Sequence, residues 1–163
     1  MINALAAAAL YSDCGRPRSN SEIGDYRRSF ASFSIEHRNS SWMLDEPMRM
    51  ISCELADLAL ECSRDNWDGY GAASISESTF ENAFRFVASI PFDIPQPEVG
   101  ATSCGDITFE WSQGNRRIVS IAVSGNGKLY YASLNGMERQ YGSLLLDGRF
   151  HPSFHALVAS VLG

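Results

Sequence analysis

The chain has 163 residues, of which 45% are hydrophobic, and its formal net charge at pH 7 is −6. This length and apolar content suffice for one domain with a core of its own, without metal or disulfide staples. The acidic balance argues against direct nucleic-acid binding, which needs concentrated Lys and Arg, and no apolar stretch reaches the roughly 20 residues that cross a bilayer.

Residues 1–41 are the least regular part of the sequence. The Ala-rich run at residues 4–10 predicts a short helix, because no Lys or Arg precedes it and no clean cleavage site follows it, as a signal peptide would require. Residues 30–35 could add an edge strand to a sheet. We therefore expect an N-terminal arm at 1–41, with a helix and an edge strand as its candidate elements, and a single α+β domain at residues 42–163.

A first clear helix is predicted over residues 46–63. Asp45 can cap this helix, and Pro47 lies in its first turn, where a missing N–H costs least. The buried face is marked by apolar side chains that recur at helical spacing, namely Ile51, Leu55, Leu58 and Cys62.

Acidic residues are concentrated around this helix. Residues 42–71 carry two basic and seven acidic side chains, which is a net charge of −5. Three of the carboxylates, Glu54, Asp57 and Glu61, lie off the apolar face of the helix. Such carboxylates are usually the solvated side of an amphipathic helix, but an acidic patch can also attract a basic partner. Both interpretations stay open.

The connection at residues 65–72 combines two aromatic rings, two aspartates and two glycines. The glycines, two positions apart, predict positive φ angles. The segment could form a ligand-binding ledge on which Trp67 and Tyr70 stack and Asp68 accepts a hydrogen bond. We favour the alternative, a rigid corner between helices in which both rings are buried and Asp68 accepts from nearby backbone N–H groups.

Beyond this connection, a second helix is predicted over residues 75–89. Ser74 and Glu77 have the spacing of a capping box, and Pro91 ends the helix. A proline-rich connector then holds the chain extended as far as Val99.

From Asp106 onward, the hydrophobic pattern has the period of two that is typical of strands. Turns rich in Asn and Gly, a strong hairpin signal, separate four predicted strands at residues 107–112, 118–123, 129–134 and 137–141. A last helix is predicted over 152–162. The expected fold class is α+β, an antiparallel four-stranded β-meander with about three helices packed on one face.

No group of residues has the spacing of a known catalytic or metal site. His151 and His155 lie four apart, but no third ligand is evident. The loop at residues 124–128 leads into a strand, whereas a phosphate-binding loop leads into a helix. Paired carboxylates for acid and base work could come from Asp65, Asp68, Asp106 and Glu110. Because a nucleophile is missing, we predict no catalytic residues, no metal and no cofactor.

The spacing of the cysteines predicts their redox state and, from it, the cellular compartment of the protein. Their spacing fits neither a C-x-x-C motif nor a zinc site, so buried reduced thiols are the expected state of Cys14, Cys53, Cys62 and Cys104. Reduced thiols are typical of the cytoplasm. We therefore expect a cytoplasmic protein.

The run from Asn66 to Ala72, the Ser74-Ile75-Ser76 segment, the proline-rich connector and the Gly105–Trp111 hairpin resemble a family of small bacterial and phage proteins whose function is unknown. The resemblance covers roughly residues 55–142 and departs from the family at Ser74, where proline is common. It implies a cytosolic protein often carried on phages or mobile elements. It supplies no activity and no functional residues.

These observations favour a non-enzymatic protein-binding module, a phage or mobile-element factor that binds and inhibits a host or defence complex through an acidic surface. The expected partner is a protein with a basic surface. The predicted contact residues are Glu54, Asp57, Glu61, Asp65, Trp67, Asp68 and Tyr70. One alternative is a small-molecule-binding protein or hydrolase that uses the 65–72 connection with Glu110, and another is an antitoxin or immunity partner.

Overall fold

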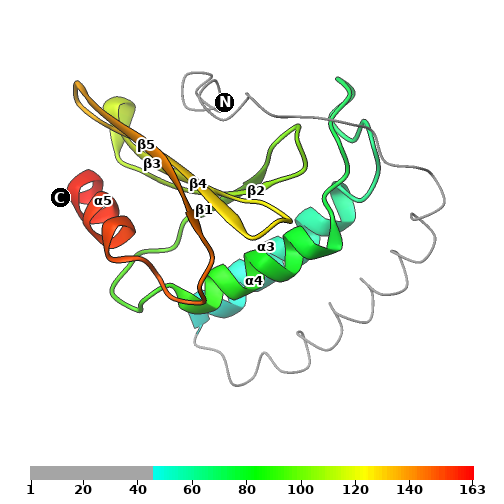
Figure 1. The fold of residues 1–163 in the computed structure, drawn as a ribbon, viewed down its shortest axis with the longest axis horizontal. Helices are drawn as coiled ribbons and strands as arrows, with labels where there is room; N and C mark the ends of the chain where they lie inside the picture. Colours follow the sequence, from blue (N-terminus) through cyan, green and yellow to red (C-terminus); the bar gives the residue numbers. More distant parts are fainter. Residues whose placement is uncertain (1–45) are drawn as a thin grey trace.

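The structure is a computed structural model that describes residues 46–163, so the predicted arm at 1–41 lies outside the described residues. The helices lie on one side of a twisted antiparallel sheet (Figure 1). In chain order the elements are α3 (Glu46–Glu61), α4 (Glu77–Ser89), β1 (Glu98–Ala101), β2 (Ile107–Ser112), the 3-10 helix η3 (Gly114–Arg116), β3 (Arg117–Val123), β4 (Lys128–Asn135), β5 (Glu138–Leu145) and α5 (Pro152–Leu162). This arrangement confirms the α+β class.

The sheet has five strands in the order β1-β2-β3-β4-β5, so the prediction of four strands was wrong. The additional strand is β1, which follows the proline-rich connector and pairs with β2 through Val99 opposite Phe109 and Ala101 opposite Ile107. Its four residues include Gly100, which has no side chain to contribute to a β pattern. A Cβ at Gly100 would lie 3.0 Å from Thr108 Oγ1, so a larger residue there would require the Thr108 side chain to shift by a few tenths of an ångström.

The core lies between the sheet and the helices. Alternate residues of β2 and β3 point to this side and are buried. Phe86 of α4 sits at the centre, with its ring 5.0 Å from that of Phe109 and 6.4 Å from that of Phe154. The opposite face of the sheet carries polar and small side chains such as Glu110, Ser120 and Ala132.

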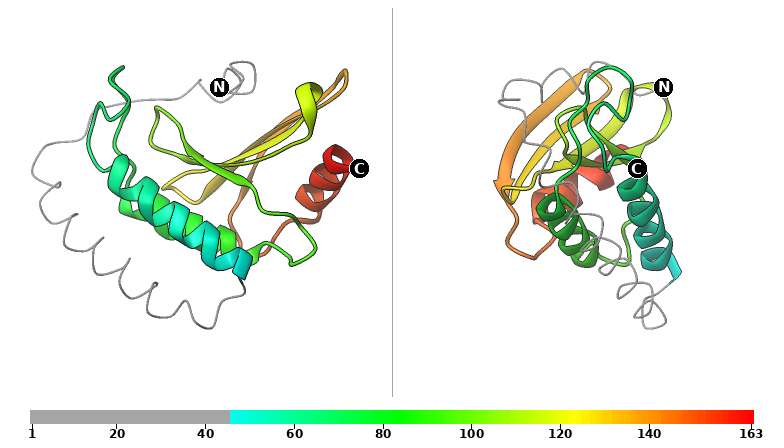
Figure 2. Two further views of the ribbon diagram at one scale, coloured as in Figure 1. Left: turned by 180° about the vertical axis from the view of Figure 1, so that it is seen from behind. Right: turned by 90° about the vertical axis from the view of Figure 1, so that its right-hand side faces the viewer.

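The helices follow the predicted apolar spacing. The α3 and α4 helices lie side by side under the sheet (Figure 2), and α5 has the predicted bounds. However, α4 begins at Glu77, and its N-cap is Ser76, whose side chain accepts from the Thr79 N–H at 3.1 Å. The predicted cap at Ser74 was therefore two residues too early, because the Ser74 N–H is bound by Asp65 Oδ1 at 2.9 Å.

Candidate functional site

The outer face of α3 presents an acidic stripe. Ile51, Leu55 and Ala59 are buried against the core, and this orientation turns the opposite side of the helix to solvent. The solvent side carries Glu54, Asp57 and Glu61, all exposed, together with Met50 and Leu60, which are 50% and 64% exposed. We call these five residues the α3 stripe.

The positions of the three carboxylates of the α3 stripe lower the stability of α3. Glu54, Asp57 and Glu61 follow one another at spacings of three and four, where like charges repel. Glu61 is also the last helical residue, at the negative end of the helix dipole, and no basic residue lies in the last turn. Within the described part of the chain, no ion pair compensates these three charges. The helix therefore carries exposed negative charge that lowers its own stability.

The 65–72 connection holds its own backbone in place. Asn66 adopts a left-handed conformation, with φ 61°, and its Oδ1 accepts from the Gly71 N–H at 2.7 Å. Asp68 Oδ1 accepts from the N–H groups of Tyr70 at 2.8 Å and Ala72 at 3.1 Å. These backbone hydrogen bonds lower the pKa of Asp68 below its ordinary value, because they favour the charged form. Asp68 thus contributes to the rigidity of the corner.

The two aromatic rings of the connection have different environments. Trp67 is half-buried against the core, and its Nε1–H donates to the Ala73 carbonyl at 3.1 Å. Tyr70 is 94% exposed. The expectation that both rings are buried in the corner was therefore wrong for Tyr70, since the tight turn at Gly69 and Gly71 directs it outward.

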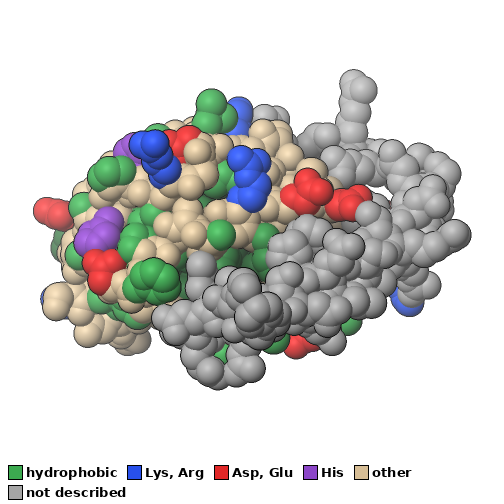
Figure 3. Space-filling view, turned by 90° about the horizontal axis from the view of Figure 1, so that it is seen from below, with side chains coloured by type: hydrophobic (Ala, Val, Ile, Leu, Met, Phe, Trp, Pro, Cys, Tyr) green, Lys and Arg blue, Asp and Glu red, His purple; other side chains and the backbone are tan. Residues whose placement is uncertain are grey.

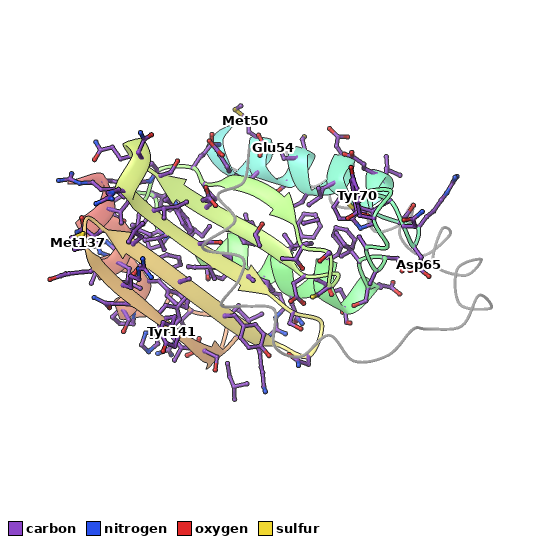
Figure 4. The ribbon with its side chains drawn as sticks, turned by 90° about the horizontal axis from the view of Figure 1, so that it is seen from above. Met50, Glu54, Asp65, Tyr70, Met137 and Tyr141 are labelled. Atoms are coloured by element: carbon purple, nitrogen blue, oxygen red, sulfur yellow. The ribbon has the colours of Figure 1, made fainter. Side chains whose placement is uncertain are left out.

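The predicted contact residues consequently divide into two groups. Asp65, Trp67 and Asp68 bind backbone groups of the corner. The three carboxylates of the α3 stripe and Tyr70 face solvent. Seen from above, Met50 and Glu54 on α3 and Tyr70 and Asp65 on the connection lie along the same side of the molecule (Figure 4). The exposed residues of the predicted site thus come from α3 and the connection that follows it.

The carboxylates considered for acid and base work occupy different parts of the fold. Asp106 lies in the β1–β2 hairpin, where burial raises its pKa and a hydrogen bond with Ser124 partly offsets that effect. Glu110 lies on the face of the sheet that points away from the helices, opposite Glu98, and burial, followed by the charge of Glu98, raises its pKa. Among residues 46–163, no group of three or more His, Cys, Asp and Glu side chains is arranged to hold a metal ion.

The two histidines of α5 take part in local contacts. His151 is the N-cap residue, and its Nδ1 accepts from the Ser153 N–H at 3.2 Å. His155 Nε2 lies 2.9 Å from Asp93 Oδ2, and this hydrogen bond lowers the pKa of Asp93. His151 thus caps α5, and His155 links this helix to the connector between α4 and β1.

The cysteines require a correction. Cys53 and Cys62 are free; Cys62, the residue that directly follows α3, is buried as predicted, whereas Cys53 is exposed and the expectation that it is buried was wrong. Cys104, however, is disulfide-bonded, so the expectation of reduced thiols throughout the chain was wrong. A disulfide persists in oxidising surroundings, and the cysteines therefore lose their value as an argument for a cytoplasmic location.

Exposed apolar side chains also occur at the far end of the sheet, a feature that the sequence reasoning missed. Met137, Tyr141 and Leu145 are 85%, 76% and 73% exposed. Met137 and Tyr141 lie at the opposite end of the molecule from Tyr70 (Figure 4). The spacing of Tyr141 and Leu145 on one face of a strand was the signal that could have revealed them.

Viewed from below, the described surface carries Lys and Arg, Asp and Glu, and apolar side chains interspersed (Figure 3). None of the helices in the described part is long and apolar enough to span a membrane.

No protein-family model matches the chain, and comparisons with curated proteins and with solved structures found no match either. The resemblance to small bacterial and phage proteins therefore stays a prediction.

Proposed function

We propose that this chain is a non-enzymatic protein-binding module that recognises a basic surface of a larger protein through the α3 stripe and Tyr70. The observation that carries the proposal is the exposed charge of α3. Glu54, Asp57 and Glu61 form no ion pair within the described residues and weaken the helix that bears them. Residues that break a local stability rule without compensation are expected where function requires them.

The apolar neighbours of these carboxylates support a protein partner over a small ion. Met50 and Leu60 are half or more exposed, and Tyr70 is almost fully exposed. Tyrosine and methionine are enriched in protein interfaces, where a ring or thioether supplies contact area and charged groups at the rim supply orientation. A strip of carboxylates with these side chains beside them has both components.

The biological setting is part of the proposal and rests on the resemblance. We place the module in the cytoplasm, as a phage or mobile-element factor that inhibits a host or defence complex. Its acidic strip would occupy a basic groove by imitating nucleic-acid phosphates, with no direct contact to nucleic acid.

The alternative functions gain no support from the geometry. A small-molecule site or hydrolase would need the 65–72 connection and Glu110 to act together, but Asp68 binds its own backbone and Glu110 lies on the open face of β2. An antitoxin or immunity role rests on no observation in the described residues.

The test is affinity purification of the full chain from its native host, with the recovered partner quantified. The stripe variant carries Glu54→Lys and Glu61→Lys. The matched control carries Glu81→Lys and Glu138→Lys, which change the net charge equally at exposed positions outside the stripe. We expect the stripe variant to lose about tenfold or more of the partner, because close charge pairs at interfaces couple strongly.

The control variant should recover the partner as the native chain does. Circular dichroism of both variants verifies that each is folded. Equal recovery of the partner by the stripe variant and the native chain would reject the proposal. Equal losses by the stripe variant and the control variant would reject it as well, because binding would then depend on net charge and not on the α3 stripe.

A further inference from the structure

Among residues 46–163, the β5 strand forms a long edge of the sheet that pairs on one side only, with β4. At the other edge, β1 has only four residues and packs against α3, whereas β5 has eight residues. The register with β4 shows which backbone groups of β5 remain available. The Leu146 N–H donates to the Gly127 carbonyl at 2.8 Å, so even-numbered residues of β5 face β4 and odd-numbered residues face outward.

The outward-facing residues are Arg139, Tyr141, Ser143 and Leu145. No hydrogen bond within residues 46–163 uses their outward backbone groups. Their side chains lie on the face of the sheet that the helices leave open, and all four are exposed. This edge therefore offers a row of backbone donors and acceptors beside exposed side chains, which is the requirement for adding another strand.

The usual protection of an edge strand is missing from most of β5. Natural sheets prevent edge pairing with inward charges, Pro, bulges or very short strands. The segment from Tyr141 to Leu146 contains neither a charge nor a proline, and it exposes 76% of Tyr141 and 73% of Leu145. These exposed apolar groups would gain by being covered.

We propose that the occupant of this edge is a second copy of the chain, paired antiparallel about a two-fold axis at Ser143. In this register Ser143 faces its own counterpart, and Tyr141 of each copy lies opposite Leu145 of the other. Every pair joins outward-facing residues, so the backbone ladder continues from one sheet into the next. Aromatic and aliphatic side chains that lie opposite one another across strands stabilise such a pair.

Charge complementarity selects this register. One step beyond the Tyr141 and Leu145 pair, Arg139 of one copy meets Asp147 of the other, and the symmetry repeats the contact. Asp147 Oδ1 accepts from the Arg149 N–H at 3.0 Å, and its second oxygen can accept from the guanidinium of Arg139. A self-complementary surface of this kind is what a two-fold interface requires. The β5 edge is distant from Met50 and Tyr70 (Figure 4), so this inference does not depend on the proposed function.

The test is sedimentation velocity of the full chain over a concentration series. We expect the native chain to form a dimer. Arg139→Asp alone and Asp147→Arg alone each place like charges opposite one another twice per dimer, and each should weaken dimerisation by about tenfold or more. The double variant restores opposite charges in exchanged positions and should regain most of the native affinity.

Arg85→Asp is the matched control, because it makes the same charge change at an exposed position of α4 and should leave the dimer intact. Circular dichroism of each variant verifies the fold. A native chain that stays monomeric at every soluble concentration would overturn the proposal, since the edge would then be covered by residues 1–45, bind another protein or stay open. A dimer that the single reversals do not weaken, or that the double reversal does not restore, would overturn it as well.

Discussion

Replacing Trp67 with phenylalanine should destabilise the protein more than removing the whole side chain of Tyr70. Trp67→Phe eliminates the Nε1–H that donates to the Ala73 carbonyl at 3.1 Å and retains most of the apolar ring against the core. A hydrogen bond of this kind contributes about 1 kcal/mol to the free energy of unfolding. Tyr70→Ala removes a ring that is 94% exposed, so the expected change is within about 0.5 kcal/mol.

Urea denaturation followed by far-ultraviolet circular dichroism measures both changes on the same scale. For a chain of this size, 1 kcal/mol corresponds to a decrease of about 2–4 °C in Tm. Tyr70→Ala should in addition weaken partner binding, whereas Trp67→Phe should affect binding only through stability. A larger loss of stability from Tyr70→Ala than from Trp67→Phe would refute the division of this connection into a structural ring and an exposed ring.

Three further predictions concern the core and the buried ionisable groups. Raised pKa values mean that folded Asp106 and Glu110 bind protons that the unfolded chain has released, so the contribution of these two groups to the free energy of unfolding should fall as the pH rises from about 4. In denaturation at several pH values, Asp106→Asn and Glu110→Gln should therefore each gain stability relative to the native chain as the pH rises. Burial, followed by the charge of Glu61, raises the pKa of the Cys62 thiol to about 11, so a thiol reagent at pH 8 should label exposed Cys53 well before Cys62, as peptide mass spectrometry would show. Phe86→Ala should cost about 3–5 kcal/mol in chemical denaturation, because this fully buried ring contacts those of Phe109 and Phe154.

The elements with strong local signals were predictable from the sequence. The apolar spacing of α3 and α5 and the Asn- and Gly-rich turns between the later strands depend on residues close together in the chain. The predicted helix at 152–162 coincides with α5, and the predicted strand at 107–112 coincides with β2. In these parts, local preference and the final fold agree.

The errors occurred where distant residues decide the structure. Gly100 and its neighbours form a strand only because Val99 and Ala101 pair with β2. The Ser74 N–H is bound by Asp65, nine residues earlier, and the helix cap therefore moves to Ser76. Neither contact leaves a periodic pattern in the sequence.

The candidate site was predictable in composition but not in geometry. Helical spacing placed Glu54, Asp57 and Glu61 off the buried face, and all three are exposed. The sequence could not show that Trp67 packs against the core while Tyr70, three residues later, is exposed, because both are aromatic residues of one irregular connection with no periodic pattern. It also could not show the free edge of β5, which depends on where the sheet ends.

Hydroxyl-radical footprinting of the full chain, with and without its captured partner, tests the proposed binding face most directly. Met50 and Tyr70 report on the α3 side, while Met137 and Tyr141, residues of the same two types, report on the β5 end; the four are 50%, 94%, 85% and 76% exposed. If the partner binds along α3, it should protect Met50 and Tyr70 from oxidation and leave Met137 and Tyr141 unchanged. Protection confined to Met137 and Tyr141, with Met50 and Tyr70 oxidised as in the free chain, would contradict the account.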